Sequence, residues 1–264
     1  MLEGLGEVRD KVLDNALLAG GETLLDVGCG EGLLGFGALE RGAGHVAFSD
    51  ISDDCLEFCR ETAEVLELSE RCGFVRASAD EVAGVGEASV DVVTTRSVLI
   101  YVERKARAFA EFFRVLRPGG RISLFEPINR FATDEQCDGF WWYPTDGLAE
   151  LAARIQSVYD AIQPPSDPML DFDERDLVRF AQEAGFFPIE LELRAEVKPV
   201  EPRPWASFLN SSGNPKIPTF AEAMDRALTP EERREVTKHL QPLVEQGAGT
   251  WRMATAFLTA VKPA

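Results

Sequence analysis

Apolar residues in the first half of the chain follow two patterns, short apolar runs and helical stripes. A short apolar run is typical of a buried strand in a parallel sheet, whereas apolar positions three or four residues apart predict an amphipathic helix. The runs predict strands at 24–27, 45–50, 73–77, 90–95 and 121–126. The stripes and capping residues predict helices at 5–18, 33–42 and 103–116 and one starting after Ser52. Because strands alternate with helices, this half predicts an α/β fold with a parallel sheet covered on both faces.

The helix expected at 103–116 should turn Ala106, Phe109, Ala110 and Phe113 inward.

The regular alternation stops after residue 126, where prolines and aromatic residues become frequent. The remaining pattern predicts a helix near 146–162, a helix capped by Asp173 and ending at 184, a strand at 188–197, a helical insertion at 202–250 and a last strand at 251–261. Within the insertion, Thr229-Pro230-Glu231-Glu232 is a strong helix start, and the glycines at 247–249 should end that helix. We therefore expect a single domain over 1–264, with 127–170 and 202–250 as lid or insertion segments.

Composition limits the partners that the chain can have. Its 264 residues are 45% hydrophobic, enough for a full core, and its net charge of −18 would repel a nucleic-acid backbone or an anionic membrane surface. The sequence also shows no apolar run long enough to span a bilayer and no secretory signal. Five cysteines without a C-x-x-C pair, and two histidines, disfavour a metal site. These features predict a reduced, cytoplasmic protein that binds neither nucleic acid nor membranes.

Three glycines at alternate positions join the first predicted strand to its helix, and they are Gly28, Gly30 and Gly32. A glycine turn there lets the backbone approach a ligand, and the helix start offers free N–H groups. The segment 30–35 matches the dinucleotide pattern G-x-G-x-x-G. However, Glu31 would then lie beside a pyrophosphate, which a carboxylate repels. The alternative ligand is S-adenosylmethionine (SAM).

The sequence D-V-G-C-G-E-G, which begins at Asp26, resembles the first motif of class I SAM-dependent methyltransferases. In that family the turn passes under an amino-acid group and a ribose, so no phosphate meets Glu31. Asp50 at the end of the second strand, V-D-V-V-T-T at 90–95 and L-R-P-G-G at 116–120 resemble further motifs, in family order. The resemblance implies a Rossmann-like sheet of seven strands whose last strand is antiparallel. The run 254–261 fits that last strand.

The same resemblance implies a set of cofactor-binding residues. A carboxylate can accept hydrogen bonds from both ribose hydroxyls, which suits Asp50. Where the family often has Asp-Ala after the third strand, this chain has Ser78-Ala79-Asp80, so either Ser78 or Asp80 could meet the adenine amino group. The full set is Asp26, Gly28, Cys29, Gly30, Gly32, Asp50, Ile51, Ser78, Ala79, Asp80, Thr95 and Arg96.

The residues that follow the fourth strand exclude some classes of methyl acceptor. Nucleic-acid and glutamine amino-methyltransferases carry Asn-Pro-Pro-Tyr there, whereas this chain has Thr95-Arg96-Ser97-Val98. Metal-dependent catechol-type enzymes need clustered carboxylates at this point, and these four residues are not carboxylates. We therefore expect a small-molecule acceptor and no metal.

Three residues are candidates for catalysis. Methyl transfer from a sulfonium is an in-line displacement, and a base is needed only if the nucleophile must lose a proton. Glu126 could serve as base or counter-charge, or could cap backbone N–H groups. Tyr101 could point over the methyl group, and Arg96 could hold a substrate carboxylate or anchor its loop.

The two late segments are candidates for covering the site. Segment 127–170 leaves the fifth strand at the carboxyl edge, where open α/β sheets bind ligands. Within its aromatic cluster at 140–143, Trp141, Trp142 and Tyr143 could wall the substrate or could be a core plug. Segment 202–250 could also cover the site, or form a homodimer contact.

The sequence thus predicts transfer of a methyl group from SAM to N, O or C of a small molecule, with S-adenosylhomocysteine (SAH) as product. Natural-product metabolism is one setting for such a reaction. Three alternatives remain open, namely a SAM-binding enzyme that does not methylate, such as a cyclase, a protein methyltransferase, and a regulatory SAM binder.

Overall fold

The computed structural model describes residues 2–132, 141–214 and 216–264 of the chain. It forms two compact units. The first comprises 1–127, 172–194 and 255–264, and the second comprises 128–171 and 195–254. The two segments predicted as insertions, 127–170 and 202–250, fall almost wholly in the second unit.

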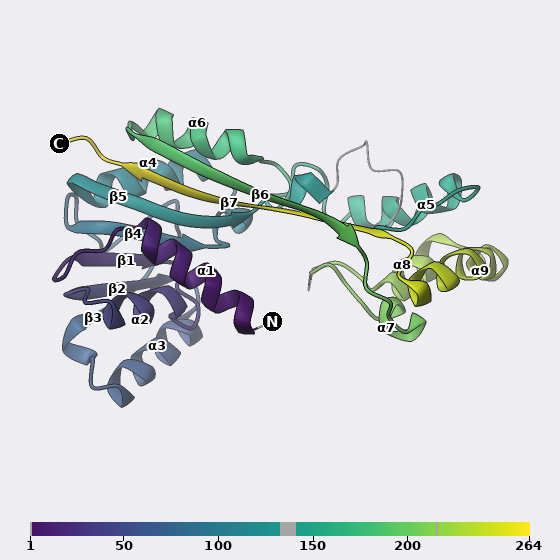
Figure 1. Ribbon diagram of the computed structural model, residues 1–264, viewed down its shortest axis with the longest axis horizontal. Coiled ribbons are helices and arrows are strands. Elements are labelled where there is room, and N and C mark those ends of the chain that lie inside the picture. The colour runs from purple at the N-terminus through teal and green to yellow at the C-terminus, as the bar shows by residue number, and fades with distance from the viewer. Residues whose placement is uncertain (1, 133–140, 215) are drawn as a thin grey trace. The chain divides into compact units, whose positions relative to one another are not determined.

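A seven-stranded sheet organises the first unit (Figure 1). Its strands are β1 (Thr23–Val27), β2 (His45–Asp50), β3 (Cys72–Arg76), β4 (Val90–Arg96), β5 (Leu116–Pro127), β6 (Ile189–Pro199) and β7 (Thr250–Val261). The strand order is β3-β2-β1-β4-β5-β7-β6, and β7 runs antiparallel to β5. The predicted Rossmann-like sheet is therefore confirmed. The far ends of β6 and β7 belong to the second unit.

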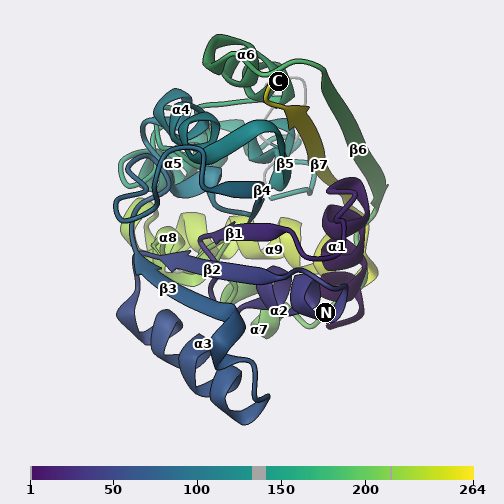
Figure 2. The same ribbon diagram turned by 90° about the vertical axis from the view of Figure 1, so that its left-hand side faces the viewer.

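Helices cover both faces of the sheet. Figure 2 shows α1 (Leu2–Asn15), α2 (Leu33–Glu40) and α3 (Asp53–Val65) on one face, with α4 (Lys105–Val115) and α6 (Glu174–Ala184) on the other. The short 3-10 helices are η1 (Ser69–Arg71), η2 (Leu99–Tyr101) and η3 (Asn129–Ala132). Two helix starts confirm the sequence prediction, because the side chain of Ser52 accepts a hydrogen bond from the Cys55 N–H and Asp173 forms a capping box.

The inward face predicted for α4 was partly wrong. Phe109 is buried as expected, but Ala106 and Ala110 are exposed and Phe113 is half-buried. The helix instead buries the stripe that holds Ala108, Phe109, Phe112 and Val115. This stripe also buries the carboxylate of Glu111, which Arg114 and the Val82 N–H satisfy. A charged residue such as Glu111 can therefore lie on the buried face of a helix when its carboxylate has partners, so the spacing of apolar residues alone does not identify that face.

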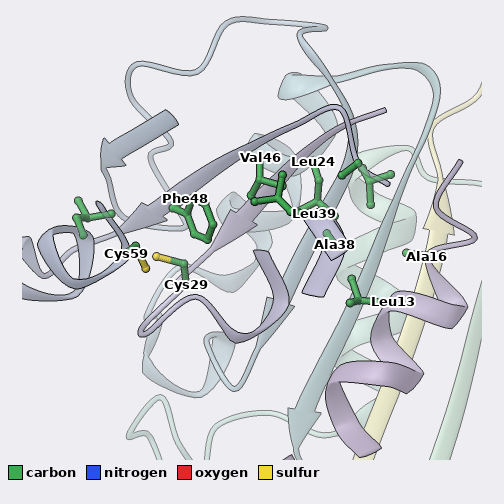
Figure 3. Close-up of a cluster of buried hydrophobic side chains, with 12 residues drawn as sticks. Leu13, Ala16, Leu24, Cys29, Ala38, Leu39, Val46, Phe48 and Cys59 are labelled. Atoms are coloured by element: carbon green, nitrogen blue, oxygen red, sulfur yellow. The ribbon is translucent and has the colours of Figure 1, made fainter. Parts of the chain in front are cut away.

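The core beneath the glycine turn is a cluster of buried side chains from α1, β1, α2, β2, α3 and β4 (Figure 3). Phe48 from β2 packs on Phe36 and Phe74. Cys29 from the turn and Cys59 from α3 lie next to each other at one end of the cluster. This packing fixes the turn onto the sheet.

The second unit is mainly helical. It contains α5 (Ala149–Asp160), α7 (Trp205–Leu209), α8 (Phe220–Ala227) and α9 (Pro230–Gln246). The predicted start and end of α9 are confirmed, because Thr229 forms a capping box and Gly247 ends the helix in the left-handed conformation. Across the described residues, none of the helices is long and apolar enough to cross a membrane.

Candidate functional site

The glycine turn at the carboxyl end of β1 is built from alternating left-handed residues. The backbone φ angles of Gly28, Gly30 and Gly32 are +62°, +51° and +81°. A Cβ atom on Gly28 would lie 2.4 Å from Cγ2 of Val98, so packing requires glycine there. A Cβ atom on Gly30 would meet no atom within 4 Å. Gly30 therefore borders open space, which is where a ligand can approach the backbone.

Asp50 joins the end of β2 to this turn. One carboxylate oxygen of Asp50 accepts a hydrogen bond from the Gly30 N–H and the other accepts one from the Ser52 N–H, both at 2.9 Å. A carboxylate offers about four acceptor positions, so about two remain for a ligand. The neighbouring side chain of Ile51 is 69% exposed, which leaves an apolar surface beside these acceptors.

Asp26 acts from beneath the turn. Its carboxylate is buried, accepting a hydrogen bond from the Gly35 N–H at 2.9 Å and one from the Thr94 hydroxyl at 3.3 Å. Burial raises the pKa of Asp26 to about 7. Asp26 thus connects β1 to β4 and to the start of α2, which shapes the turn from inside the fold.

Cys29 and Cys59 hold the turn from the side of α3. The Cys59 thiol donates to the Gly30 carbonyl at 3.3 Å, and the Cys29 N–H donates to the Ser49 carbonyl at 3.0 Å. A hydrogen bond with the Cys59 thiol and burial both raise the pKa of Cys29, so its thiol stays protonated at neutral pH. The Cys29 side chain therefore packs beneath the turn, and a role of Cys29 in binding the cofactor stays a prediction.

Ser78, Ala79 and Asp80 follow β3, as expected. The Ser78 hydroxyl donates to Asp80 at 2.5 Å, and Nε of Arg104 donates to the other carboxylate oxygen of Asp80 at 2.8 Å. Burial opposes ionisation of Asp80, but these two hydrogen bonds keep its pKa below the ordinary value. Arg104 was not predicted, and an exposed arginine before a helix carries no sequence signal for this contact. The choice between Ser78 and Asp80 as adenine contact stays open.

Glu126 lies at the end of β5 with its side chain completely buried. Its carboxylate accepts hydrogen bonds from the N–H groups of Val98, Leu99 and Ile100 at 3.0, 3.0 and 3.3 Å. The Thr95 hydroxyl contacts it at 3.5 Å. Burial raises the pKa of Glu126 to about 7, despite the opposing effect of these donors. These contacts show Glu126 capping backbone N–H groups, which was one of the roles predicted for it. A role as base or counter-charge stays a prediction.

Residues 96–101 extend from β4 through η2. Tyr101 is 60% exposed, and Arg96 is half-buried, with a guanidinium that makes no hydrogen bond or ion pair with the described residues. Ser97 adopts a left-handed φ of +56°, which is rare for a residue other than glycine. Neither this strain nor the packing of Val98 against Gly28 could be inferred from sequence, because both depend on contacts across the sheet edge.

The predicted substrate wall belongs to the second unit. Tyr143 is fully buried and Trp141 packs against Tyr159, Phe208 and Phe220, with ring centroids 5.5–6.0 Å apart. Trp142 is 37% exposed. Phe140, also in the predicted cluster, and Cys137 lie outside the described residues. Tyr143 and Trp141 thus lie in the core of the second unit, which is one of the two roles left open for this cluster. Among the three described residues of the cluster, Trp142 is the most exposed.

A pocket of about 550 Å³ lies on the second unit between α8 and α9. It contains none of the residues predicted to bind ligands, and its lining is Asp225, Leu228, Pro230, Arg233, Arg234, Thr237 and Lys238. In the described parts of both units, no three His, Cys, Asp or Glu side chains are grouped for a metal ion. Independence from metals stays a prediction.

Comparison with known proteins places this geometry in context. Residues 25–124 match a family model described as a methyltransferase domain. A ubiquinone/menaquinone biosynthesis C-methyltransferase of Ruegeria sp. is 28% identical over 180 residues, which cover 67% of this chain and 71% of that protein. A ubiquinone biosynthesis O-methyltransferase of Aromatoleum aromaticum is 35% identical over 116 residues, or 44% of this chain. The match spans about half (47%) of the length of that O-methyltransferase.

A solved structure supports the fold. A crystal structure of a protein described as a putative methyltransferase from Bacillus halodurans superposes with a TM-score of 0.60 at 21% identity, covering 97% of this chain and 99% of that one. The motifs appear in family order along the strands, and the glycine turn, Asp50 and the sheet topology have the arrangement that the motifs predict. The chain therefore carries a methyltransferase domain over residues 25–124, and its relatives and its fold support a class I SAM-dependent methyltransferase.

Proposed function

We propose that the chain transfers a methyl group from SAM to a small-molecule acceptor and releases SAH. The observation that carries the proposal is the hydrogen bond between Asp50 and the Gly30 N–H. It brings a carboxylate with free acceptor positions beside a backbone turn whose outer side is open. Bound SAM supplies a methyl group on a positively charged sulfur.

The residues present fit this cofactor. The turn at 28–32 would lie along its amino-acid part, and the remaining acceptor positions of Asp50 would take the two ribose hydroxyls. The exposed side chain of Ile51 and residues 78–80 would border the adenine. Glu31 is exposed next to the turn, where its carboxylate suits a cationic cofactor and disfavours a pyrophosphate.

Displacement at a sulfonium asks the protein mainly to align the acceptor and to exclude water. Arg96 ends β4 and Tyr101 ends η2, which follows β4 in the first unit, and these two residues are our candidates for aligning the acceptor. Arg96 would suit an acceptor with a carboxylate, because its guanidinium makes no hydrogen bond or ion pair with the described residues. In the second unit, Trp142 is the aromatic candidate for substrate contact.

The acceptor is a small molecule in this proposal. A net charge of −18 disfavours nucleic acid. The relatives named above act in quinone biosynthesis by name, but the family model that matches this chain ends at residue 124, before the two segments, 127–170 and 202–250, that are predicted to cover the site. The proposal leaves open whether the methylated atom is nitrogen, oxygen or carbon. It also includes a homodimer.

Calorimetry with SAM, SAH and NADH tests the cofactor. We expect binding of SAM and SAH and none of NADH; the reverse would support a dinucleotide enzyme. Incubation with SAM and pools of small molecules then tests the reaction by product mass. A gain of one CH₂ supports methyl transfer, whereas a converted product of unchanged mass supports an enzyme that uses SAM without methylating. Cofactor binding without turnover on any pool would support a regulatory binder.

A further inference from the structure

The loop that follows β4 is held by one buried carboxylate. Three consecutive backbone N–H groups, those of Val98, Leu99 and Ile100, donate to Glu126, which lies 26 to 28 residues further along the chain. Consecutive N–H groups converge on one acceptor only when the backbone turns tightly, as it does entering η2. Glu126 therefore stabilises a specific loop conformation.

This loop conformation carries strain. The left-handed φ of +56° at Ser97 is unfavourable for a residue with a side chain. Such a conformation persists only where the surroundings hold it in place. The Ser97 N–H donates to the Phe125 carbonyl at 2.8 Å, and the next three N–H groups donate to Glu126. The end of β5 thus supplies the acceptors for four consecutive N–H groups of the loop.

The loop also contacts the glycine turn. The side chain of Val98 lies so close to Gly28 that a Cβ atom on Gly28 would overlap it. Displacement of Val98 would remove the support on this side of the turn. Because Gly28 and Gly30 belong to the same turn, a change at Val98 would alter the backbone that faces the ligand.

We propose that Glu126 is a positioning residue that holds residues 97–101, and through Val98 the glycine turn, in the conformation that binds the cofactor. The effect on the loop stands on its own, whereas the effect on SAM rests on the proposed function. A general base would act on the acceptor and leave the loop unchanged. A positioning residue controls loop order and cofactor affinity together.

The decisive variant is Glu126→Gln. Glutamine keeps the shape, but its NH₂ group cannot accept, so at least one loop N–H would face a donor. Asp91→Asn is the control at the opposite, amino end of β4, where Asp91 accepts hydrogen bonds from the Thr23 N–H at 2.8 Å and from the Arg117 guanidinium at 2.6 Å. Hydrogen exchange of individual amides and calorimetry with SAH are the two readouts.

We expect Glu126→Gln to speed exchange at the amides of 98–100 by about tenfold or more and to weaken SAH binding by about tenfold, which is the loss of about one net hydrogen bond. Asp91→Asn should leave both the protection of the amides of 98–100 and the SAH affinity at their wild-type values. Val98→Ala keeps the main-chain bonds, so it should weaken SAH binding while the amides of 98–100 stay protected.

Several outcomes would overturn the proposal. Unchanged exchange at 98–100 in Glu126→Gln would show that the carboxylate does not hold the loop. Faster exchange with unchanged SAH affinity would show that the loop is not coupled to the cofactor site. If the wild-type protein binds neither SAM nor SAH, the proposed function fails, while the exchange experiment still decides whether Glu126 positions the loop.

Discussion

Gly30→Ala separates the role of the glycine turn in binding from its role in folding. Gly30 has a φ of +51°, and a Cβ atom there would meet no protein atom within 4 Å. The new methyl group would therefore create no clash in the protein itself. It would project into the open space that we assign to the cofactor, beside the N–H that donates to Asp50.

The expected stability loss follows from the backbone alone. An alanine in the left-handed region costs about 1–2 kcal/mol. Gly119→Ala is the matched control, because Gly119 has a φ of +78°, would likewise place a Cβ atom with no neighbour within 4 Å, and lies in the turn before the final part of β5. Both variants should lose a similar free energy of unfolding. Only Gly30→Ala should lose affinity for SAH, by at least about tenfold, or 1.4 kcal/mol.

Calorimetry with SAH and denaturant unfolding of both variants provide the measurements. The reasoning is refuted if Gly30→Ala binds SAH as tightly as the wild type while both variants lose the same stability. It is also refuted if Gly119→Ala weakens SAH binding to the same extent, because backbone strain anywhere in the first unit would then explain the loss.

Three further predictions concern other parts of the chain. Asp50→Ala should weaken SAH binding by about 1–3 kcal/mol in calorimetry, because it removes charge-assisted hydrogen bonds; unchanged affinity would contradict the ribose assignment. Burial places the pKa of Asp26 and of Glu126 at about 7 in the folded chain, above their ordinary values of 3.8 and 4.5, so the folded state holds more protons than the unfolded state between these values. The free energy of unfolding should therefore fall as pH rises from about 5 to 8, by up to about 3 kcal/mol per group, and a flat profile in denaturant unfolding would argue against it. The buried hydroxyl of Tyr143 has no hydrogen-bond partner among the described residues. Tyr143→Phe should therefore change stability by less than about 1 kcal/mol, whereas Tyr143→Ala should cost about 3–5 kcal/mol in the same assay; a small effect of Tyr143→Ala would mean that the ring is not part of the core.

The sequence by itself determined the elements whose signals are local. Short apolar runs located the first five strands of the sheet, because a strand covered by helices on both faces is mostly apolar. Ser52, Asp173 and Thr229 marked helix starts, because their side-chain oxygens satisfy N–H groups within three residues. The glycine motif and Asp50 predicted the ligand edge, because the carboxyl ends of adjacent parallel strands meet there.

Only the tertiary structure decided what the buried carboxylates do. Glu126 meets Val98 from 28 residues away, and Asp26 meets Thr94 from 68 residues away. Periodicity reports whether a position is buried, but it carries no information about which distant group satisfies a buried oxygen. The aromatic cluster could not be assigned from sequence for the same reason. Trp141 and Tyr143 pack against Phe208 in the core of the second unit, but a substrate-binding wall would have the same sequence pattern. Such roles depend on which elements pack together, and that is a property of the whole fold.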